Sequence, residues 1–207
     1  MKKIQYLLGI LMILTVFALK SVYLLGGPKI LNTVALIIIC VFISLLIFTV
    51  RKVYFIAAVL VFAFLAELFN LIFDGQTPLT MLFYFGMHFP LMIYLIRNYD
   101  KSTRLFFELP LCVFVMFFVY SFGFWNERPM YYIAMVIYSV LLCVNLTLSY
   151  GINTMAFRGM LMVFLVDTIV VWSLVEGGVE LIRGLCWLPF MAGIWLLAEG
   201  AREKQKV

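Results

Sequence analysis

Long uncharged apolar runs recur from one end of the chain to the other, and no other feature constrains the fold as strongly. Hydrophobic residues make up 66% of the 207 residues and charged residues only 12%, which is more apolar surface than one soluble core can bury. A helix of roughly 20 apolar residues crosses the hydrocarbon core of a bilayer with its backbone hydrogen bonds satisfied. The sequence therefore predicts an all-α, polytopic membrane helix bundle.

Turn sequences divide these runs into about eight predicted spans. Pro28, Pro78 and Pro129 each stand near a helix start, where the missing N–H costs little. The spans are predicted at residues 4–25, 30–50, 53–73, 79–96, 105–124, 130–150, 155–175 and 181–198. They form a single transmembrane domain over residues 1–207. The first run is expected to be kept as a helix, because residues 18–20 make a poor signal-peptide cleavage site.

Basic residues gather on one predicted side of the membrane, which favours a cytoplasmic location for both chain ends. That side collects Lys2, Lys3, Arg51, Lys52, Arg97, Lys101, Arg104, Arg158, Arg202, Lys204 and Lys206. The other side keeps only Lys20, Lys29, Arg128 and Arg183. The net charge of +5 is therefore a topology signal, and no nucleic-acid partner is expected. We expect an integral protein of the bacterial cytoplasmic (inner) membrane.

Several membrane chemistries lack their required residues. His88 is the single histidine, so a zinc hydrolase is not expected. The sequence contains no Gly-x-Ser-x-Gly elbow and no phosphate-binding glycine loop. The four cysteines have no paired spacing and are interpreted as packing residues. We expect no metal ion and no cofactor, which leaves acid/base chemistry, solute passage or a structural role.

Three ionisable residues inside the predicted spans are the most informative: Glu67, His88 and Asp167. A charge at mid-membrane costs about 2.5 to 3.5 kcal/mol or more, so each needs a partner or a function. Asp167 and His88 both lie about 13 Å from a basic residue at the cytoplasmic end of their spans, so they share a depth. Glu67 and Tyr84 form a second pair of similar depth, nearer the outer leaflet.

The fourth span carries further signals of a site. Tyr84 and His88 are four residues apart and share a helix face. Pro90 removes a backbone hydrogen bond to Gly86, and this is expected to open the helix beside His88. Asn70, one turn beyond Glu67 in span three, can donate to a carboxylate. The alternative for these residues, and the interpretation adopted for Asn145, is polar contact that only holds helices together.

The order of features resembles the YhhN-like membrane family, whose characterised members are lysoplasmalogenases. Residues 159–167, ending in Asp167, are similar to the family's span-seven segment, and Phe83-Tyr84-Phe85-Gly86 with Tyr94 is similar to its span four. Ala66-Glu67 stands where the family has Gly-Asp. Two other departures are Val166 in place of a Ser and the position of His88, only two residues after Gly86.

This resemblance implies cleavage of the vinyl ether of a lysophospholipid, which would be drawn from membrane lipid, to a fatty aldehyde and a glycerophospho-headgroup. Such a reaction needs a general acid and a general base. Asp167, whose sequence neighbours are more apolar, is expected to be the acid and Glu67 the base. Four residues are expected to bind the substrate: Tyr84, His88, Asn70 and Tyr94.

Two functions from other classes remain open. A small transporter or proton-coupled carrier would use Glu67, His88 and Asp167 as relay sites. Carriers often contain inverted repeats with matching broken helices, and the second half of this chain has no counterpart of Gly86-x-His88-x-Pro90. A non-catalytic membrane assembly protein would tolerate loss of all three ionisable residues.

Overall fold

A computed structural model describes residues 2–73, 78–100, 129–175 and 186–204, and these residues form seven helices. The helices are α1 (Lys2–Leu24), α2 (Lys29–Val50), α3 (Tyr54–Phe73), α4 (Pro78–Asn98), α6 (Pro129–Tyr150), α7 (Thr154–Val175) and α9 (Trp187–Lys204). No strand occurs among these residues. The predicted all-α class is confirmed for the part of the chain that is described.

Six of the predicted spans coincide with these helices to within two residues at each end. The span predicted at 105–124 and the first residues of the span predicted at 181–198 lie outside the described residues. The helix α9 continues to Lys204, past residue 198, at which the last span is predicted to end. Packing explains the extension, because Ala198 and Ala201 are buried beyond the apolar stretch.

Three of the described helices are long and apolar enough to cross a membrane: Tyr6–Leu24 within α1, α2 and α3. Large hydrophobic side chains such as Leu11, Phe48 and Ile72 stand exposed on their outer faces. Exposed apolar surface of this kind fits a lipid environment. These helices indicate a membrane protein, while the count of eight spans remains a prediction.

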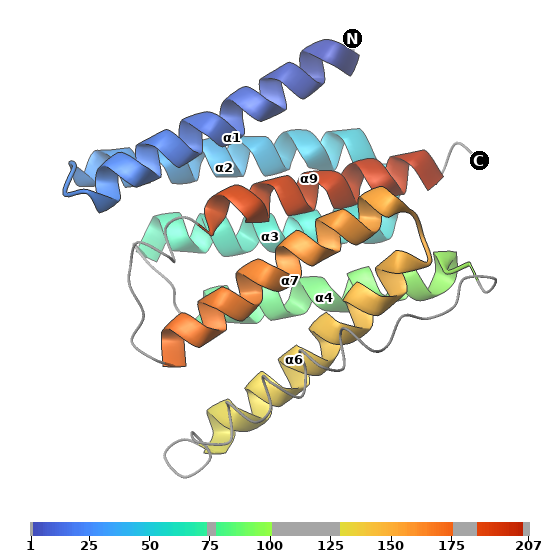
Figure 1. Ribbon diagram of the computed structural model, residues 1–207. Coiled ribbons are helices and arrows are strands. Elements are labelled where there is room, and N and C mark those ends of the chain that lie inside the picture. Colours follow the sequence, from blue (N-terminus) through green and yellow to red (C-terminus); the bar gives the residue numbers. More distant parts are fainter. Residues whose placement is uncertain (1, 74–77, 101–128, 176–185, 205–207) are drawn as a thin grey trace.

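The helices α1 to α4 alternate in direction, and so do α6, α7 and α9, so that the start of α1 and the end of α9 lie at the same end of the bundle (Figure 1). We call this the terminal end and the opposite one the far end. The terminal end carries Arg51, Lys52, Arg97, Arg158, Arg202 and Lys204, whereas Lys20 and Lys29 lie toward the far end. This distribution is what the predicted cytoplasmic location of both ends requires.

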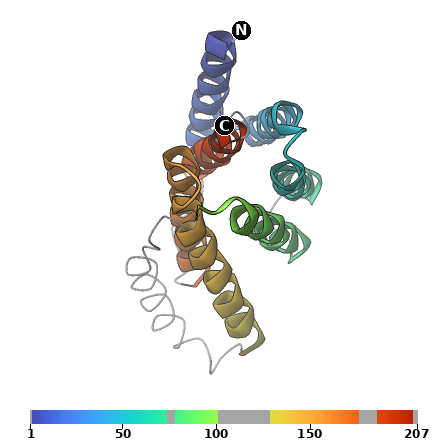
Figure 2. The ribbon, with the colours of Figure 1, turned by 90° about the vertical axis from the view of Figure 1, so that its right-hand side faces the viewer.

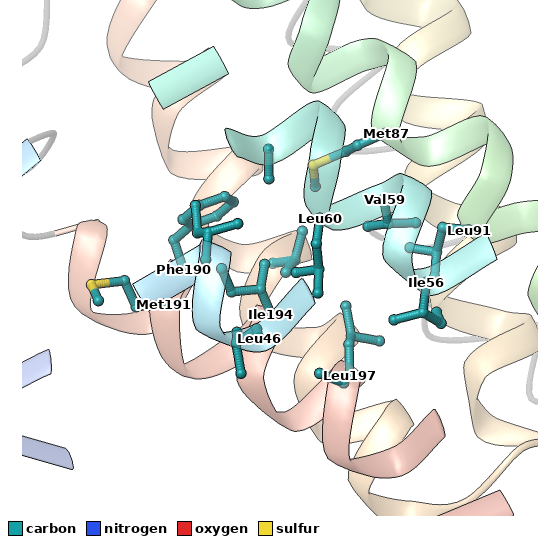
Figure 3. Packing of buried hydrophobic residues seen from close by; sticks show 14 of the residues in the cluster. Leu46, Ile56, Val59, Leu60, Met87, Leu91, Phe190, Met191, Ile194 and Leu197 are labelled. Atoms are coloured by element: carbon teal, nitrogen blue, oxygen red, sulfur yellow. The ribbon is translucent and has the colours of Figure 1, made fainter. Parts of the chain in front are cut away.

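α9 is the central packing element of the bundle (Figure 2). It packs against α7 and also contacts α1, α2 and α3, while α6 connects α4 with α7. The shared core is built from side chains of several helices, including Leu46 of α2, Leu60 of α3, Met87 of α4 and Ile194 of α9 (Figure 3). This packing brings α3, α4, α6 and α7 close enough to share a polar interior.

α7 and α9 approach each other backbone to backbone. A Cβ atom added to Gly159 would lie 2.7 Å from the carbonyl oxygen of Gly193 and 2.7 Å from the backbone nitrogen of Leu197. A Cβ atom added to Gly193 would lie 3.0 Å from the carbonyl oxygen of Gly159. Small residues permit such close helix contacts within a membrane. The contact determines where α7, and hence Asp167, sits in the bundle.

Asn153 links the start of α7 to the end of α9. Its Oδ1 atom accepts a hydrogen bond from the backbone N–H of Ala156 at 2.8 Å, and its Nδ2 donates to the carbonyl of Gly200 at 2.8 Å. The first contact is an N-cap, which satisfies one of the free N–H groups at the helix start. The second ties the two helices together at the terminal end.

Asn153→Ala is expected to destabilise the protein by about 1 to 2 kcal/mol through loss of the cap. For a chain of this size that corresponds to roughly 2 to 8 °C in the melting temperature, measured on detergent-purified protein. Asn153→Asp keeps the capping oxygen and loses only the amide donor, so an intermediate loss is expected. Equal melting temperatures for the wild type and Asn153→Ala would contradict the capping role.

Candidate functional site

Glu67, Asn70 and Tyr84 form one buried polar group, which we call the Glu67 cluster. The Glu67 side chain is 0% exposed and accepts a hydrogen bond from the Tyr84 hydroxyl. The amide nitrogen of Asn70 lies 3.5 Å from Glu67 Oε2 and 3.3 Å from the Tyr84 oxygen. Asn70 comes from the next turn of α3, and Tyr84 comes from α4. The predicted proximity of these three residues is confirmed.

Lys20 of α1 lies within electrostatic range of the Glu67 cluster, a position that was not anticipated. Its place in the sequence indicated only membrane topology. The structure buries it, with Nζ 2.6 Å from Asn32 Oδ1 and 5.0 Å from the ring centroid of Trp187. Its positive charge also interacts with the Glu67 carboxylate. A buried charge of this kind needs such partners, because isolated charges are costly away from water.

His88, Tyr138, Asn145 and Asp167 form a second group, the His88 cluster, contributed by α4, α6 and α7. The imidazole Nε2 lies 3.2 Å from the Tyr138 hydroxyl and 3.5 Å from Asp167 Oδ2. On the other side of the ring, Nδ1 lies 3.3 Å from the amide nitrogen of Asn145. The expectation that His88 and Asp167 share a depth is confirmed.

The two clusters meet along one face of α4. Tyr84 and His88 are one turn apart on this face, and the charge of Asp167 reaches Tyr84 as well as Tyr138. Glu67 from α3 therefore lies on one side of Tyr84 and Asp167 from α7 lies within electrostatic reach of it. Two carboxylates from different helices thus lie at this face of α4, with Glu67 hydrogen-bonded to Tyr84 and Asp167 Oδ2 3.5 Å from His88 Nε2.

α4 is continuous through Pro90, so the predicted break beside His88 is wrong. A proline removes a single backbone hydrogen bond, and neighbouring groups in a bundle can support the backbone around it. Here the Asn145 amide donates to the carbonyl oxygen of His88 at 3.2 Å. This side-chain contact falls in the turn that Pro90 weakens.

Asp167 does not have the apolar setting inferred from its sequence neighbours. Its polar partners, His88 and Tyr138, come from other helices, while the adjacent Thr168 hydroxyl donates to its own helix backbone at Phe164. The Asp167 side chain is also 13% exposed, whereas the His88 side chain is 0% exposed. Asp167 is therefore the more accessible carboxylate of the two, and this overturns the premise on which it was expected to be the acid.

Tyr94 lies apart from the hydrogen bonds of both clusters. Its side chain is buried in the hydrophobic core, nearer the terminal end of α4 than His88. Its hydroxyl has no hydrogen-bond partner among the described residues. A direct role beside Glu67 or Asp167 is not supported by this placement.

Tyr138 and Asn145 were missed as site residues, although the sequence contained a signal for them. They are seven residues apart in one helix, a spacing of about two turns that places both on the same face. Asn145 was interpreted as a contact between helices, and Tyr138 was not singled out. The imidazole of His88 packs between them, with the Tyr138 ring at 82° to its plane.

The arrangement offers proton donors and acceptors from four helices, α3, α4, α6 and α7. In the described part of the chain, no group of three or more His, Cys, Asp or Glu side chains could hold a metal ion. An apolar groove of about 260 Å³ lies elsewhere, between α2 and α3, and contains no member of either cluster. It is lined by Ile37, Cys40, Val41, Ser44, Leu45, Phe48, Phe64, Leu68 and Leu71.

The chemistry available at the clusters is proton transfer between carboxylates, a histidine and two tyrosines in a water-poor interior. Comparison of the chain with protein-family models, with curated proteins and with solved structures found no match.

Proposed function

We propose that this chain is a membrane hydrolase that cleaves the vinyl ether bond of lysoplasmalogen-type lysophospholipids. The observation that carries the proposal is the convergence of two carboxylates, Glu67 and Asp167, on the Tyr84–His88 face of α4. The sequence resemblance to the YhhN-like family points to the same chemistry. An active site inside the bilayer suits a substrate that is itself a lipid.

The reaction adds one water molecule and releases two products. A proton is added to the vinyl carbon, water adds to the resulting oxocarbenium ion, and the hemiacetal collapses to a fatty aldehyde and the glycerophospho alcohol. One group must donate the first proton and another must accept a proton from water. Two carboxylates in different surroundings can divide these tasks.

The geometry favours Asp167 as the base, which reverses the allocation expected from sequence. Asp167 is the more exposed of the two carboxylates and faces the His88 ring and the Tyr138 hydroxyl, both of which can donate to an ionised carboxylate. Glu67 is fully buried, and its contact with the Tyr84–His88 face of α4 is the hydrogen bond from the Tyr84 hydroxyl. We assign Glu67 and Tyr84 together as the source of the proton, with Asn70 orienting them.

A proton-coupled carrier is the second candidate, and one observation favours it. Five ionisable side chains lie within electrostatic range of their neighbours inside the bundle: Lys20, Glu67, Tyr84, Asp167 and His88. Such a series of ionisable groups within a membrane is typical of a proton relay. A relay predicts proton flux across a vesicle membrane, which a hydrolase does not require.

The test is aldehyde release from a lysoplasmalogen by detergent-purified protein. Wild type is compared with an Asp167→Asn/Glu67→Gln double variant and with Glu203→Gln, which alters an exposed carboxylate of α9. Aldehyde is expected from the wild type and Glu203→Gln only. Absence of aldehyde from folded wild type would refute the hydrolase, and proton flux in vesicles that is lost in the double variant would then identify the carrier.

A further inference from the structure

We infer that Asn145 is a positioning residue that holds His88 in a single neutral tautomer, with its proton on Nε2 and directed toward the Tyr138 hydroxyl oxygen on the Asp167 side of the ring. The amide nitrogen of Asn145 makes both contacts, at 3.3 Å to Nδ1 of the imidazole and at 3.2 Å to the backbone carbonyl of the same residue. The consequence for catalysis rests on the proposed function, whereas the tautomer itself does not.

The carbonyl oxygen of His88 determines which way the Asn145 amide is turned. A carbonyl oxygen can only accept hydrogen bonds, so the group that faces it must be the NH₂ end of the amide. The same NH₂ group lies against Nδ1, which must therefore accept through its lone pair. A proton on Nδ1 would place two donors against each other. The neutral ring is thus left with its proton on Nε2.

The opposite edge of the ring has acceptors ready for that proton. Nε2 lies within hydrogen-bond distance of the Tyr138 oxygen, at 3.2 Å, whereas Asp167 Oδ2 is 3.5 Å away and accepts no hydrogen bond among the described residues. Tyr138 also interacts through its hydroxyl with the Asp167 carboxylate. The donors therefore point in one direction, from Asn145 through His88 and Tyr138 to Asp167. An acceptor at the end of such a series remains available to take a proton from water.

The burial of Asn145 argues that it does more than join two helices. Its side chain is 0% exposed, and its Oδ1 atom has no hydrogen-bond partner among the described residues. An unsatisfied buried amide oxygen is costly, and a contact between helices could be made without that cost by a smaller polar side chain. The presence of an asparagine here is explained if its NH₂ group is needed to donate to both Nδ1 and the backbone carbonyl oxygen of His88.

Nuclear magnetic resonance of [¹⁵N]histidine-labelled full-length protein in detergent micelles tests the tautomer directly. Since His88 is the single histidine in the chain, the spectrum needs no assignment. The wild type is expected to show one neutral tautomer, protonated at Nε2. A wild-type ring protonated at Nδ1, or a mixture of tautomers, would overturn the inference whether or not any variant folds.

Variants separate positioning from simple packing. Asn145→Leu keeps the approximate size but removes the donor, so a mixture of tautomers is expected. Ser149→Ala, one turn further along α6, removes a buried hydroxyl that donates to the backbone carbonyl of Leu146 and should leave the histidine signal unchanged. An unchanged tautomer in folded Asn145→Leu would refute the role of Asn145.

If the hydrolase proposal holds, the same variants can also be compared by their rates of aldehyde release. Residues that orient a metal ligand through a hydrogen bond typically affect activity by about 10- to 100-fold when they are removed, and we expect an effect of similar size for the residue that orients His88. Asn145→Leu is therefore expected to lower kcat for aldehyde release by about that factor with little change in KM. An unchanged kcat would show that the tautomer does not matter for turnover. Failure of the hydrolase assay itself would leave the tautomer measurement intact, so the two hypotheses fail separately.

Discussion

Asp167→Asn is expected to lower kcat for aldehyde release by about 100-fold or more, the size of effect associated with loss of a general base. Asparagine keeps the shape of the side chain and its place beside His88 and Tyr138. Its amide, however, cannot take a proton from the attacking water. Steady-state kinetics on the purified variant measures the effect, and KM is expected to change less than kcat.

The control for this prediction is Glu203→Gln, which makes the same chemical change at an exposed position of α9 and should retain wild-type kinetics. The melting temperatures of both variants must match that of the wild type within a few degrees, so that misfolding does not explain a loss. Full activity in a folded Asp167→Asn variant would remove Asp167 from the mechanism. A loss in Glu67→Gln alone would then place the chemistry in the Glu67 cluster.

Gly159→Leu is expected to produce the largest loss of stability of any single change considered. The added side chain would meet the backbone of α9 at Gly193 and Leu197, which cannot move aside as a flexible side chain could. Overpacking typically costs about 1 to 3 kcal/mol, and a clash with backbone belongs at the upper end of this range. A loss of about 3 kcal/mol corresponds to roughly 6 to 12 °C in the melting temperature. Thermal melting of the detergent-purified protein measures the loss.

Val61→Leu is the matched control, because it enlarges an exposed, lipid-facing side chain of α3. Its melting temperature should equal that of the wild type. A graded series strengthens the test, with Gly159→Ala expected between the wild type and Gly159→Leu. If the melting temperature of the Gly159→Leu protein equals that of the wild type, α7 and α9 are not in backbone contact.

The Gly159 contact also links stability to the site. It holds α7 against α9, and α7 presents Asp167 to His88 of α4. Separation of the two helices should therefore lengthen the contact between Asp167 and His88. For this reason the activity of Gly159 variants reports on the scaffold and not on the chemistry.

Helix positions were readable from the amino-acid order because each apolar run must satisfy its own backbone inside lipid. Six predicted spans agree with described helices to within two residues. Beyond the predicted end of the last span, Ala198 and Ala201 continue α9 through contacts with other helices. Hydropathy measures the apolar length of a segment and carries no information on such contacts.

Depth along the helix axis was also predictable, because each residue advances a helix by a constant 1.5 Å. For this reason the amino-acid order alone places Glu67 and Tyr84 at one depth in the membrane, and His88 and Asp167 at another. The side-by-side arrangement of helices was not predictable in this way. It depends on close approaches such as that of Gly159 to Gly193, where the absence of a side chain matters only when the facing backbone is known.

Tertiary structure alone therefore decided the composition of the site. The neighbours of Asp167 in its own helix are mostly apolar, but in the bundle it interacts with His88 of α4 and Tyr138 of α6. Asn145, seemingly a contact between helices, lies against both the ring and the backbone of His88. Sequence periodicity describes one helix at a time, whereas the surroundings of a buried group are set by whichever helices pack against it.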